Sequence, residues 1–159
     1  MLVHENFNPL PLSKSDYHAR QLMLKDTQLD YEAVMSSIEI IRKTRGGNWP
    51  TADLTYEDDM IDLGWHQREF EFKNSFAYTV MNNDESECLG CFYLYPVNFR
   101  KVVPQNKGYD VDVSWWVTAK MYEQGFYDRL GLDIAEWLKQ WPFKKPYFSN
   151  LELPKQIQN

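Results

Sequence analysis

The sequence predicts a single α+β domain in which helices flank a mixed, mostly antiparallel central sheet. Three observations lead to this class. Apolar residues recur at helical spacing up to about residue 73, alternate with a period of two from Phe76 onward, and return to one long helical stripe over residues 124–140. The 159 residues are 43% hydrophobic and 16% aromatic, enough for one packed core at a length that suits one domain.

The beginning of the chain divides into an arm and the start of the domain. Residues 1–17 are mostly polar and carry two prolines, so we expect an arm that lies on the domain or frays. A single domain is then expected over residues 18–159. Within it, the segment His18–Asp26 contains the apolar run Leu22–Leu24, which predicts the first strand.

Two helices are expected next. The first covers Thr27–Lys43, opens with a Thr-x-x-Asp capping pattern and stops before the glycine pair 46–47. Its helically spaced apolar positions are Tyr31, Val34, Met35, Ile38 and Ile41. The second helix opens at Thr55 with an acidic first turn, which suits the helix dipole, and runs to about Lys73.

A meander of three strands should follow. Phe76–Val80 and Leu89–Tyr95 alternate with a period of two and flank the polar turn Asn82–Glu85, which predicts a hairpin. Val111–Val117 is equally rich in β-branched and aromatic residues and predicts the third strand.

The last part of the chain predicts one helix and one short strand. Gln124–Gln140 carries a continuous apolar stripe and ends before Pro142. Tyr147–Phe148 predicts a final extended piece. The expected element order is therefore β-α-α-β-β-β-α-β.

Charge and hydropathy exclude several classes of function. The net charge is −6 and no run of Lys or Arg is present, so we expect no nucleic-acid partner and no anionic membrane partner. No segment has the eighteen or so apolar residues of a membrane span. The N-terminus lacks the pattern of an export signal, so we expect a cytoplasmic protein.

The two cysteines form a Cys-x-x-Cys pair at Cys88 and Cys91. Such a pair is found in redox centres and as half of a metal site. No second pair exists and the three histidines, His4, His18 and His66, are scattered, so we expect no metal. Residues three apart in a regular strand face opposite sides, which favours plain core packing.

Three segments, together with the element order, resemble the GNAT superfamily of acyl-CoA-dependent N-acetyltransferases. Asp112–Val117 resembles its central strand, in which an acidic residue precedes a small residue, an aromatic pair and an aliphatic residue. Tyr122–Phe126 resembles the turn that opens its cofactor helix, and Leu89–Cys91 resembles the start of the preceding strand. The resemblance covers roughly residues 18–150.

The resemblance implies acetyl-CoA as cosubstrate. In the superfamily, a Gln/Arg-x-x-Gly-x-Gly/Ala turn presents backbone N–H groups to the diphosphate, and the pantetheine arm takes the place of a strand partner. Here the turn reads Lys120-x-x-Glu123-x-Gly125; Glu123 replaces a glycine and is expected to cost about 1–4 kcal/mol of cofactor affinity. The implied cofactor-binding residues are Trp115, Trp116, Val117, Lys120, Glu123, Gln124, Gly125, Phe126 and Tyr127. Core packing is the alternative role for Trp115, Trp116 and Tyr127.

The resemblance also implies direct transfer of the acetyl group to an amine. Asp112 is the first candidate for the general base and Asp110 the second, although both carboxylates suit a solvated strand end equally well. Tyr147 is the candidate acid. The implied acceptor-binding residues are Trp49, Asn48 and Tyr93.

Three functions remain open at this point. The first is an acetyl-CoA-dependent N-acetyltransferase for a primary amine on a small molecule or a peptide. The second is a GNAT-fold binding or regulatory module without catalysis, which Glu123 and the few residues after Gln140 favour. The third is a protein that completes its sheet in a homodimer. An open gap between the third meander strand and the last strand indicates catalysis, and a gap filled by side chains, with Trp116 and Phe148 the expected ones, indicates the second function.

Overall fold

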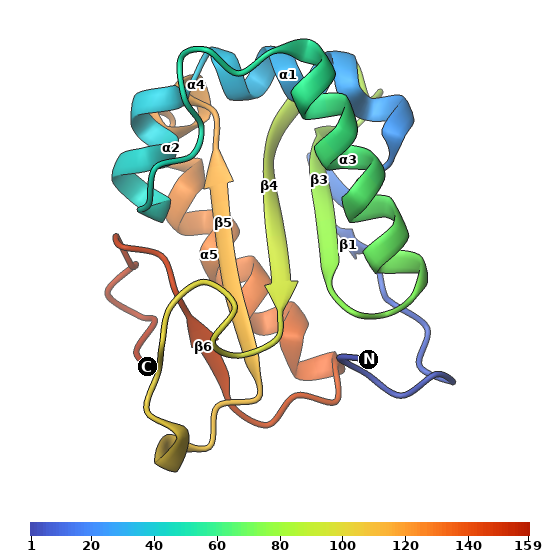
Figure 1. The fold of residues 1–159 in the computed structure, drawn as a ribbon. Helices are drawn as coiled ribbons and strands as arrows, with labels where there is room; N and C mark the ends of the chain where they lie inside the picture. The colour runs from blue at the N-terminus through green and yellow to red at the C-terminus, as the bar shows by residue number, and fades with distance from the viewer.

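The computed structural model describes residues 1–159 and contains one six-stranded sheet in the order β1-β2-β3-β4-β5-β6 (Figure 1). The strands are β1 (Leu12–Ser13), β2 (Tyr17–Gln21), β3 (Phe76–Asn82), β4 (Cys88–Tyr95), β5 (Val111–Val117) and β6 (Pro146–Phe148). The helices are α1 (Thr27–Met35), α2 (Ile38–Arg45), α3 (Tyr56–Glu71), α4 (Ala119–Glu123) and α5 (Phe126–Trp137). Neighbouring strands are antiparallel, except that β5 and β6 are parallel. The predicted α+β class and mixed sheet are confirmed.

Each face of the sheet carries its own apolar core because side chains alternate along the strands. On β5, Val113 and Trp115 belong to a cluster of 23 buried residues that includes the apolar stripe of α5. Trp116 belongs to a second cluster of 12 buried residues, which α1, α2 and α3 cover. Figure 1 shows α3 in front of the sheet and α5 behind it.

The start of α3 follows the sequence closely. The Thr55 hydroxyl accepts a hydrogen bond from the Asp58 N–H at 3.1 Å, and the Asp58 carboxylate accepts one from the Thr55 N–H at 3.2 Å. This reciprocal pair satisfies two N–H groups that a helix start leaves free. The predicted helix start at Thr55 is confirmed.

The predicted first strand at Leu22–Leu24 was wrong. The strand is Tyr17–Gln21, whose alternate residues Tyr17 and Ala19 are buried. Leu22 is buried at the end of this strand, but Leu24 is 48% exposed and opens a single 3₁₀ turn that ends at Asp26. An apolar run of three residues is too short to distinguish a strand from a turn, and here it follows the end of the strand.

The predicted continuous helix Thr27–Lys43 is broken into α1 and α2 at Ser36 and Ser37. The Ser36 hydroxyl donates to the Ala33 carbonyl at 2.9 Å, and the Ser37 N–H donates to the Val34 carbonyl at 3.0 Å. Serine side chains compete with the helix for backbone partners, so a Ser-Ser pair is a natural break.

The predicted helix Gln124–Gln140 begins two residues later and is preceded by another helix. Gly125 has a φ of 78°, a left-handed conformation that glycine adopts easily, and it separates α4 from α5. Thr118 caps α4 by accepting the Met121 N–H at 3.3 Å. The chain therefore makes a one-turn helix where the sequence suggested an open turn.

A β-bulge lies at the start of β4. Val80 pairs with Gly90 and Met81 pairs with Cys88, so Leu89 is the extra residue. Its side chain joins the α5-side core, whereas both cysteines join the opposite core. The expectation that Cys88 and Cys91 face opposite sides was therefore wrong, because a bulge shifts the alternation by one residue.

The N-terminal residues lie along the sheet edge and the end of α3. β1 pairs with β2 through Leu12 and Ala19, and the Leu2 N–H donates to the Lys73 carbonyl at 2.6 Å. The division into an arm over 1–17 and a domain over 18–159 stays a prediction. No helix combines the length and the apolar character needed to cross a bilayer.

Candidate functional site

The edge of β5 that faces β6 is only partly paired. Three residue pairs join the strands, from Val111 opposite Pro146 to Val113 opposite Phe148, and the Ser149 N–H then donates to the Val113 carbonyl at 2.9 Å. Beyond this point β5 continues to Val117 without a strand partner on this side. The half of β5 from Ser114 to Val117 therefore presents a backbone edge to other groups.

One side chain bridges that edge. The amide oxygen of Asn150 accepts the Trp115 N–H at 3.0 Å, and its nitrogen donates to the Trp115 carbonyl at 2.9 Å. Asn150 is buried, and it also donates to the Tyr127 hydroxyl at 2.6 Å. The Tyr127 hydroxyl in turn donates to the Glu152 carbonyl at 2.6 Å. Trp115 thus has both backbone groups satisfied by an amide side chain rather than by a strand. The sequence-based choice of Trp116 and Phe148 as the residues that fill this gap was wrong.

A buried polar group lies where β5 and β6 meet. The Ser149 hydroxyl donates to the Asp112 carboxylate at 2.5 Å, and Arg100 donates to the Ser149 hydroxyl at 3.0 Å. The second carboxylate oxygen of Asp112 has no hydrogen-bond partner. Burial raises the pKa of Asp112, although Ser149 and Arg100 oppose the rise. A buried carboxyl with a raised pKa and a free oxygen has the properties of a general base.

A second cation lines this polar face. The Arg45 side chain donates to the Ser114 hydroxyl at 3.3 Å and stacks over the Tyr93 ring, 4.4 Å from its centroid. Burial and the nearby Arg45 lower the pKa of Arg100 to about 10. Two guanidinium groups therefore stand close to Asp112 on the α1–α3 side of the sheet.

An aromatic pocket of about 230 Å³ opens on the same face. Its lining residues are Arg45, Trp49, Asp62, Trp65, His66, Tyr93, Tyr95 and Phe99. Tyr95 stands directly across the strand pair from Asp112, so one wall of the pocket adjoins the buried carboxyl. The pocket therefore combines aromatic walls with one histidine and charges of both signs.

His66 has one ring nitrogen without a partner. Its Nε2 lies 3.4 Å from the Asp62 carboxylate, and its buried Nδ1 has no hydrogen-bond partner. Tyr93 uses its hydroxyl to accept the Trp116 indole N–H at 2.9 Å. The buried Nδ1 of the imidazole therefore has an unused hydrogen-bonding capacity.

Of the residues assigned to the acceptor from sequence, Trp49 and Tyr93 line the pocket, whereas Asn48 is exposed and does not. The sequence analysis missed Arg45, Asp62, Trp65, His66, Tyr95 and Phe99. A signal existed for one pair only, because Asp62 and His66 are four apart on α3 and share a helix face. Nothing in the sequence placed the distant Phe99 loop beside α3.

The other two candidate catalytic residues lie nearer the sheet end. Asp110 accepts the N–H groups of Lys144 and Lys145 at 2.6 and 3.0 Å, so it anchors the approach to β6. Tyr147 is opposite Asp112 in the register of β5 and β6, and it packs edge-on against Tyr109 with ring centroids 5.0 Å apart. The structure brings Tyr147, but not the carboxylate of Asp110, alongside Asp112.

The cofactor turn implied by the resemblance has few free N–H groups. The Gln124 N–H donates to the Met121 carbonyl at 3.2 Å, and the Gly125 N–H donates to the Tyr122 carbonyl at 3.0 Å. Glu123, Gln124 and Gly125 are exposed. The N–H groups of the turn are thus used within the turn itself. The N-terminus of α5, which begins at Phe126, has no side-chain cap.

The remaining residues assigned to the cofactor are placed as follows. Lys120 is exposed and forms an ion pair with Glu87 at 3.0 Å. Trp115 and Val117 are fully buried in the α5-side core, and the Trp115 indole donates to the Tyr127 carbonyl at 3.1 Å. Trp116 is equally buried in the opposite core. Only the backbone edge of these β5 residues faces the unpaired side.

No protein-family model and no curated protein sequence matches this chain, but solved structures do. RimL, a ribosomal L7/L12 alpha-N-protein acetyltransferase in complex with coenzyme A, matches with a TM-score of 0.63 and 11% identity over 86% of this chain and 72% of that one. A ribosomal-protein-S5-alanine acetyltransferase from Vibrio fischeri matches with a TM-score of 0.61 and 13% identity over 83% and 69% of the two chains.

The microcin C7 self-immunity acetyltransferase MccE, in complex with acetyl-CoA and AMP, matches with a TM-score of 0.59 and 13% identity over 84% of this chain and 68% of that one. The chain therefore has the fold of the GNAT acetyltransferases, as the sequence resemblance indicated. At such low identity the match concerns the fold, and function has to be argued from the site.

Proposed function

We propose that this protein is an acetyl-CoA-dependent N-acetyltransferase that transfers the acetyl group directly to a primary amine. The unpaired edge of β5 carries the proposal. An amide side chain, Asn150, bonds both backbone groups of Trp115 there. The pantetheine arm carries two amides, so the carbonyl of one and the N–H of the other can take over these two groups once Asn150 turns away. The fold neighbours that hold coenzyme A or acetyl-CoA support this assignment.

The acceptor amine is proposed to enter the aromatic pocket. A volume of about 230 Å³ suits a small amine or the first residue of a peptide. Aromatic faces attract a cationic amine, and the exposed carboxylate of Asp62 adds to that attraction. Arg45 offers a partner for an acceptor that also carries an anionic group. Fold neighbours that acetylate ribosomal proteins support a peptide acceptor. The fold neighbour MccE does not distinguish between a small amine and a peptide.

The proposed reaction needs a base for the ammonium proton and an acid for the leaving thiolate. Asp112 accepts the proton, directly or through a water held by the Ser149 hydroxyl, because one of its oxygens is free. The amine nitrogen then attacks the thioester carbonyl, the C–N bond forms, the nitrogen loses its second proton to solvent and the C–S bond breaks. Tyr147, alongside Asp112 in the strand register, is the proposed donor of a proton to the thiolate.

A GNAT-fold binding module without catalysis is the second candidate. Two observations favour it. The first is that Asn150, Tyr127 and the Glu152 carbonyl form a continuous hydrogen-bonded chain along the unpaired edge, which is the filled gap expected of such a module. The internal bonds of the turn around Gly125 point the same way. In this alternative the aromatic pocket still binds its ligand, but no thioester reaches it.

Release of free coenzyme A thiol separates the two candidates. The wild-type protein is incubated with acetyl-CoA and a panel of amines, from small polyamines and amino acids to short peptides with free N-termini. Amine-dependent release, with acetylated product seen by mass spectrometry, supports the acetyltransferase. Binding of an amine with no release at any concentration of acetyl-CoA identifies the module instead.

A further inference from the structure

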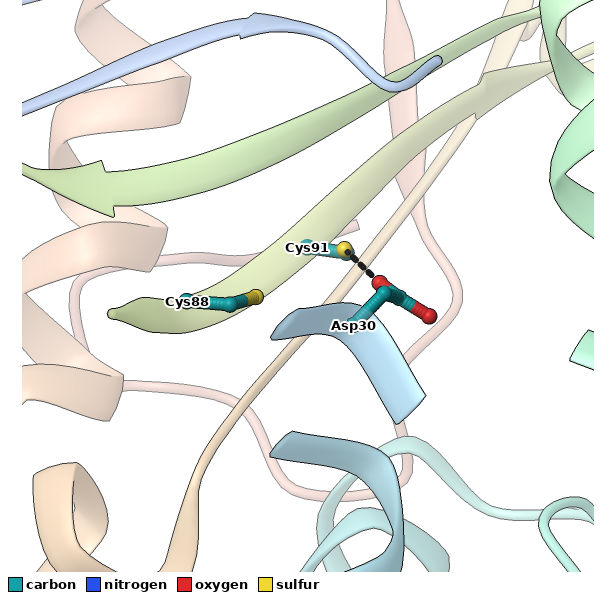
Figure 2. A group of neighbouring side chains, drawn as sticks. All are labelled: Asp30, Cys88 and Cys91. Carbon is teal, nitrogen blue, oxygen red and sulfur yellow. Dashed lines mark hydrogen bonds between the residues drawn. The ribbon is translucent and has the colours of Figure 1, made fainter. Parts of the chain in front are cut away.

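A buried cluster of metal-ligating side chains lies under α1, separate from the site described above. Cys88 and Cys91 come from β4 and Asp30 comes from α1. Their ligand atoms all lie within 4.8 Å of one another, and no residue of the three is more than 3% exposed. Figure 2 shows both cysteine side chains on the side of the strand that Asp30 approaches.

The bulge at Leu89 creates this cluster. In a regular strand Cys88 and Cys91 would lie on opposite faces, and only one thiol would meet α1. Because Leu89 is the extra residue, both thiols point to the same side, where the Cys91 thiol donates to the Asp30 carboxylate at 3.3 Å. The bulge thus converts a Cys-x-x-Cys pair into two ligands for one centre.

The cluster holds acidic groups without a compensating cation. Asp59 of α3 lies within hydrogen-bonding reach of Asp30, and its buried Oδ2 has no partner. Neither carboxyl forms an ion pair with a lysine or arginine, and His66 is the one basic group among the charges that act on the pKa of Asp59. Buried carboxylates are normally paired with a cation or coordinated to a metal.

Asp26, a few residues earlier, shows the usual arrangement for comparison. Its buried carboxylate accepts two hydrogen bonds from the Arg20 guanidinium, each 2.9 Å long. The two carboxyls are close in sequence and similarly buried, yet only Asp26 has a cation. Asp30, which contacts the two thiols, therefore lacks the cation that the neighbouring Asp26 has.

We propose that Cys88, Cys91 and Asp30 bind one Zn²⁺ ion. Two sulfur ligands and one carboxylate oxygen suit zinc, which prefers four ligands in a tetrahedron. A water held by the free Oδ2 of Asp59 supplies the fourth ligand. The bound ion connects α1 and α3 to the bulged end of β4 and so has a structural role.

Binding requires deprotonation and a small contraction. Each S–H bond breaks, its proton leaves to solvent and a Zn–S bond forms, so affinity rises with pH. Zn–S bonds of about 2.3 Å place tetrahedral ligands nearer than 4 Å to one another, a shift that side-chain rotation can supply. A pocket of about 300 Å³ lined by Glu32, Glu87 and Cys88 gives the ion a path with two carboxylates at its mouth.

Cobalt titration of the full-length, reduced, metal-free protein tests the proposal. Co²⁺ bound by thiolates gives a charge-transfer absorption, so we expect this band to saturate at one equivalent and to disappear when Zn²⁺ is added. Cys91→Ser and Asp30→Asn should each weaken Zn²⁺ binding by a factor of about 10 to 100, measured in competition with a chromophoric chelator. Asp26→Asn, the matched buried carboxyl outside the cluster, should bind with wild-type stoichiometry.

The proposal fails if the wild-type protein shows no thiolate–cobalt band under reducing conditions. It also fails if Cys91→Ser keeps the full wild-type intensity and affinity of the band, or if the only reaction of the two thiols is to form a disulfide. Circular dichroism checks the fold of each variant. If the variants do not fold, the wild-type protein still decides: Zn²⁺ should raise its melting temperature and slow alkylation of both cysteines, and no change in either would overturn the site.

Discussion

The two edges of β5 differ sharply. Toward β4, pairing runs along nearly the whole strand, from Val117 opposite Gly90 to Asp112 opposite Tyr95. Toward β6, three residues pair and a single amide side chain then replaces the strand. The first edge cannot receive a ligand, because its backbone groups are already paired with β4. On the second edge, both backbone groups of Trp115 are satisfied by one residue that a side-chain rotation can remove.

Because of this difference, the candidate catalytic residues lie at the edge of β5 that faces β6. Asp112 and Ser149 lie where the β6 pairing ends, and the aromatic pocket adjoins them across β4. A ligand that takes the place of Asn150 would therefore run toward the base and the acceptor. Substitutions at either edge of β5 should therefore have different consequences, the most severe at the edge that carries Asp112.

Asp112→Asn removes the proposed base from the β6 edge while keeping its shape. Loss of a general base typically costs a factor of about 10² to 10⁴ in rate, so kcat for amine acetylation should fall by that range. Steady-state kinetics of thiol release measure it. Asp84→Asn in the exposed β3–β4 turn is the control and should retain the wild-type rate; equal kcat for wild type and Asp112→Asn would remove Asp112 from the mechanism.

Gly90→Ala breaks the opposite, paired edge. A Cβ at Gly90 would stand 2.2 Å from the Trp116 carbonyl oxygen, which is backbone and cannot move away alone. Overpacking of this kind costs about 1–3 kcal/mol or more of unfolding free energy. Urea unfolding measures the loss. Gly64→Ala in α3 meets nothing nearer than 3.8 Å and should instead be neutral or stabilising, which tests that the effect belongs to the edge.

The pH dependence of stability reports on Asp112 without any substrate. Burial raises the pKa of Asp112 in the folded protein, so the protonated group stabilises the fold fully below the unfolded value of about 3.9. That contribution is lost as pH rises through the folded-state pKa. Unfolding free energy should therefore fall less between pH 4 and pH 8 in Asp112→Asn than in wild type. Parallel pH profiles for the two proteins would show that the carboxyl is not perturbed.

Glu123→Gln should have the smallest effect. The sequence alone suggested a cost of about 1–4 kcal/mol for a carboxylate beside a phosphate. In the structure Glu123 is an exposed residue of α4, where solvent screens its charge. We expect acetyl-CoA affinity to change by less than about tenfold, measured by titration at low and moderate salt. A larger gain would mean that the turn reorganises around the cofactor.

Elements with a long or strongly marked pattern were predictable from sequence. β5 has the predicted bounds Val111–Val117, and α3 begins at the predicted Thr55. Both carry local signals, a run of β-branched and aromatic residues in one case and a capping pair in the other. The break at Ser36–Ser37 also has a local cause, since serine side chains compete for the helix carbonyls.

Features that depend on one extra residue or on distant contacts were not predictable. The bulge at Leu89 reverses the facing of Cys88, and its only local signal is Gly90, a glycine inside a strand, which does not say where the register shifts. Asn150 is remote from Trp115 in sequence and bonds it only because β6 runs parallel to β5. Hydrophobic periodicity encodes which face is buried, but neither register shifts nor the partners of a single polar side chain.

Calorimetric titration of acetyl-CoA into the wild-type protein and into Asn150→Ala shows whether the unpaired edge of β5 is the cofactor site. Asn150 competes for the two Trp115 groups with bonds worth about 1–3 kcal/mol. If the unpaired edge of β5 receives the pantetheine arm, the wild-type protein should bind and Asn150→Ala should bind about tenfold to a hundredfold more tightly. Unchanged or weaker binding by Asn150→Ala, or no binding by either protein, would contradict the account.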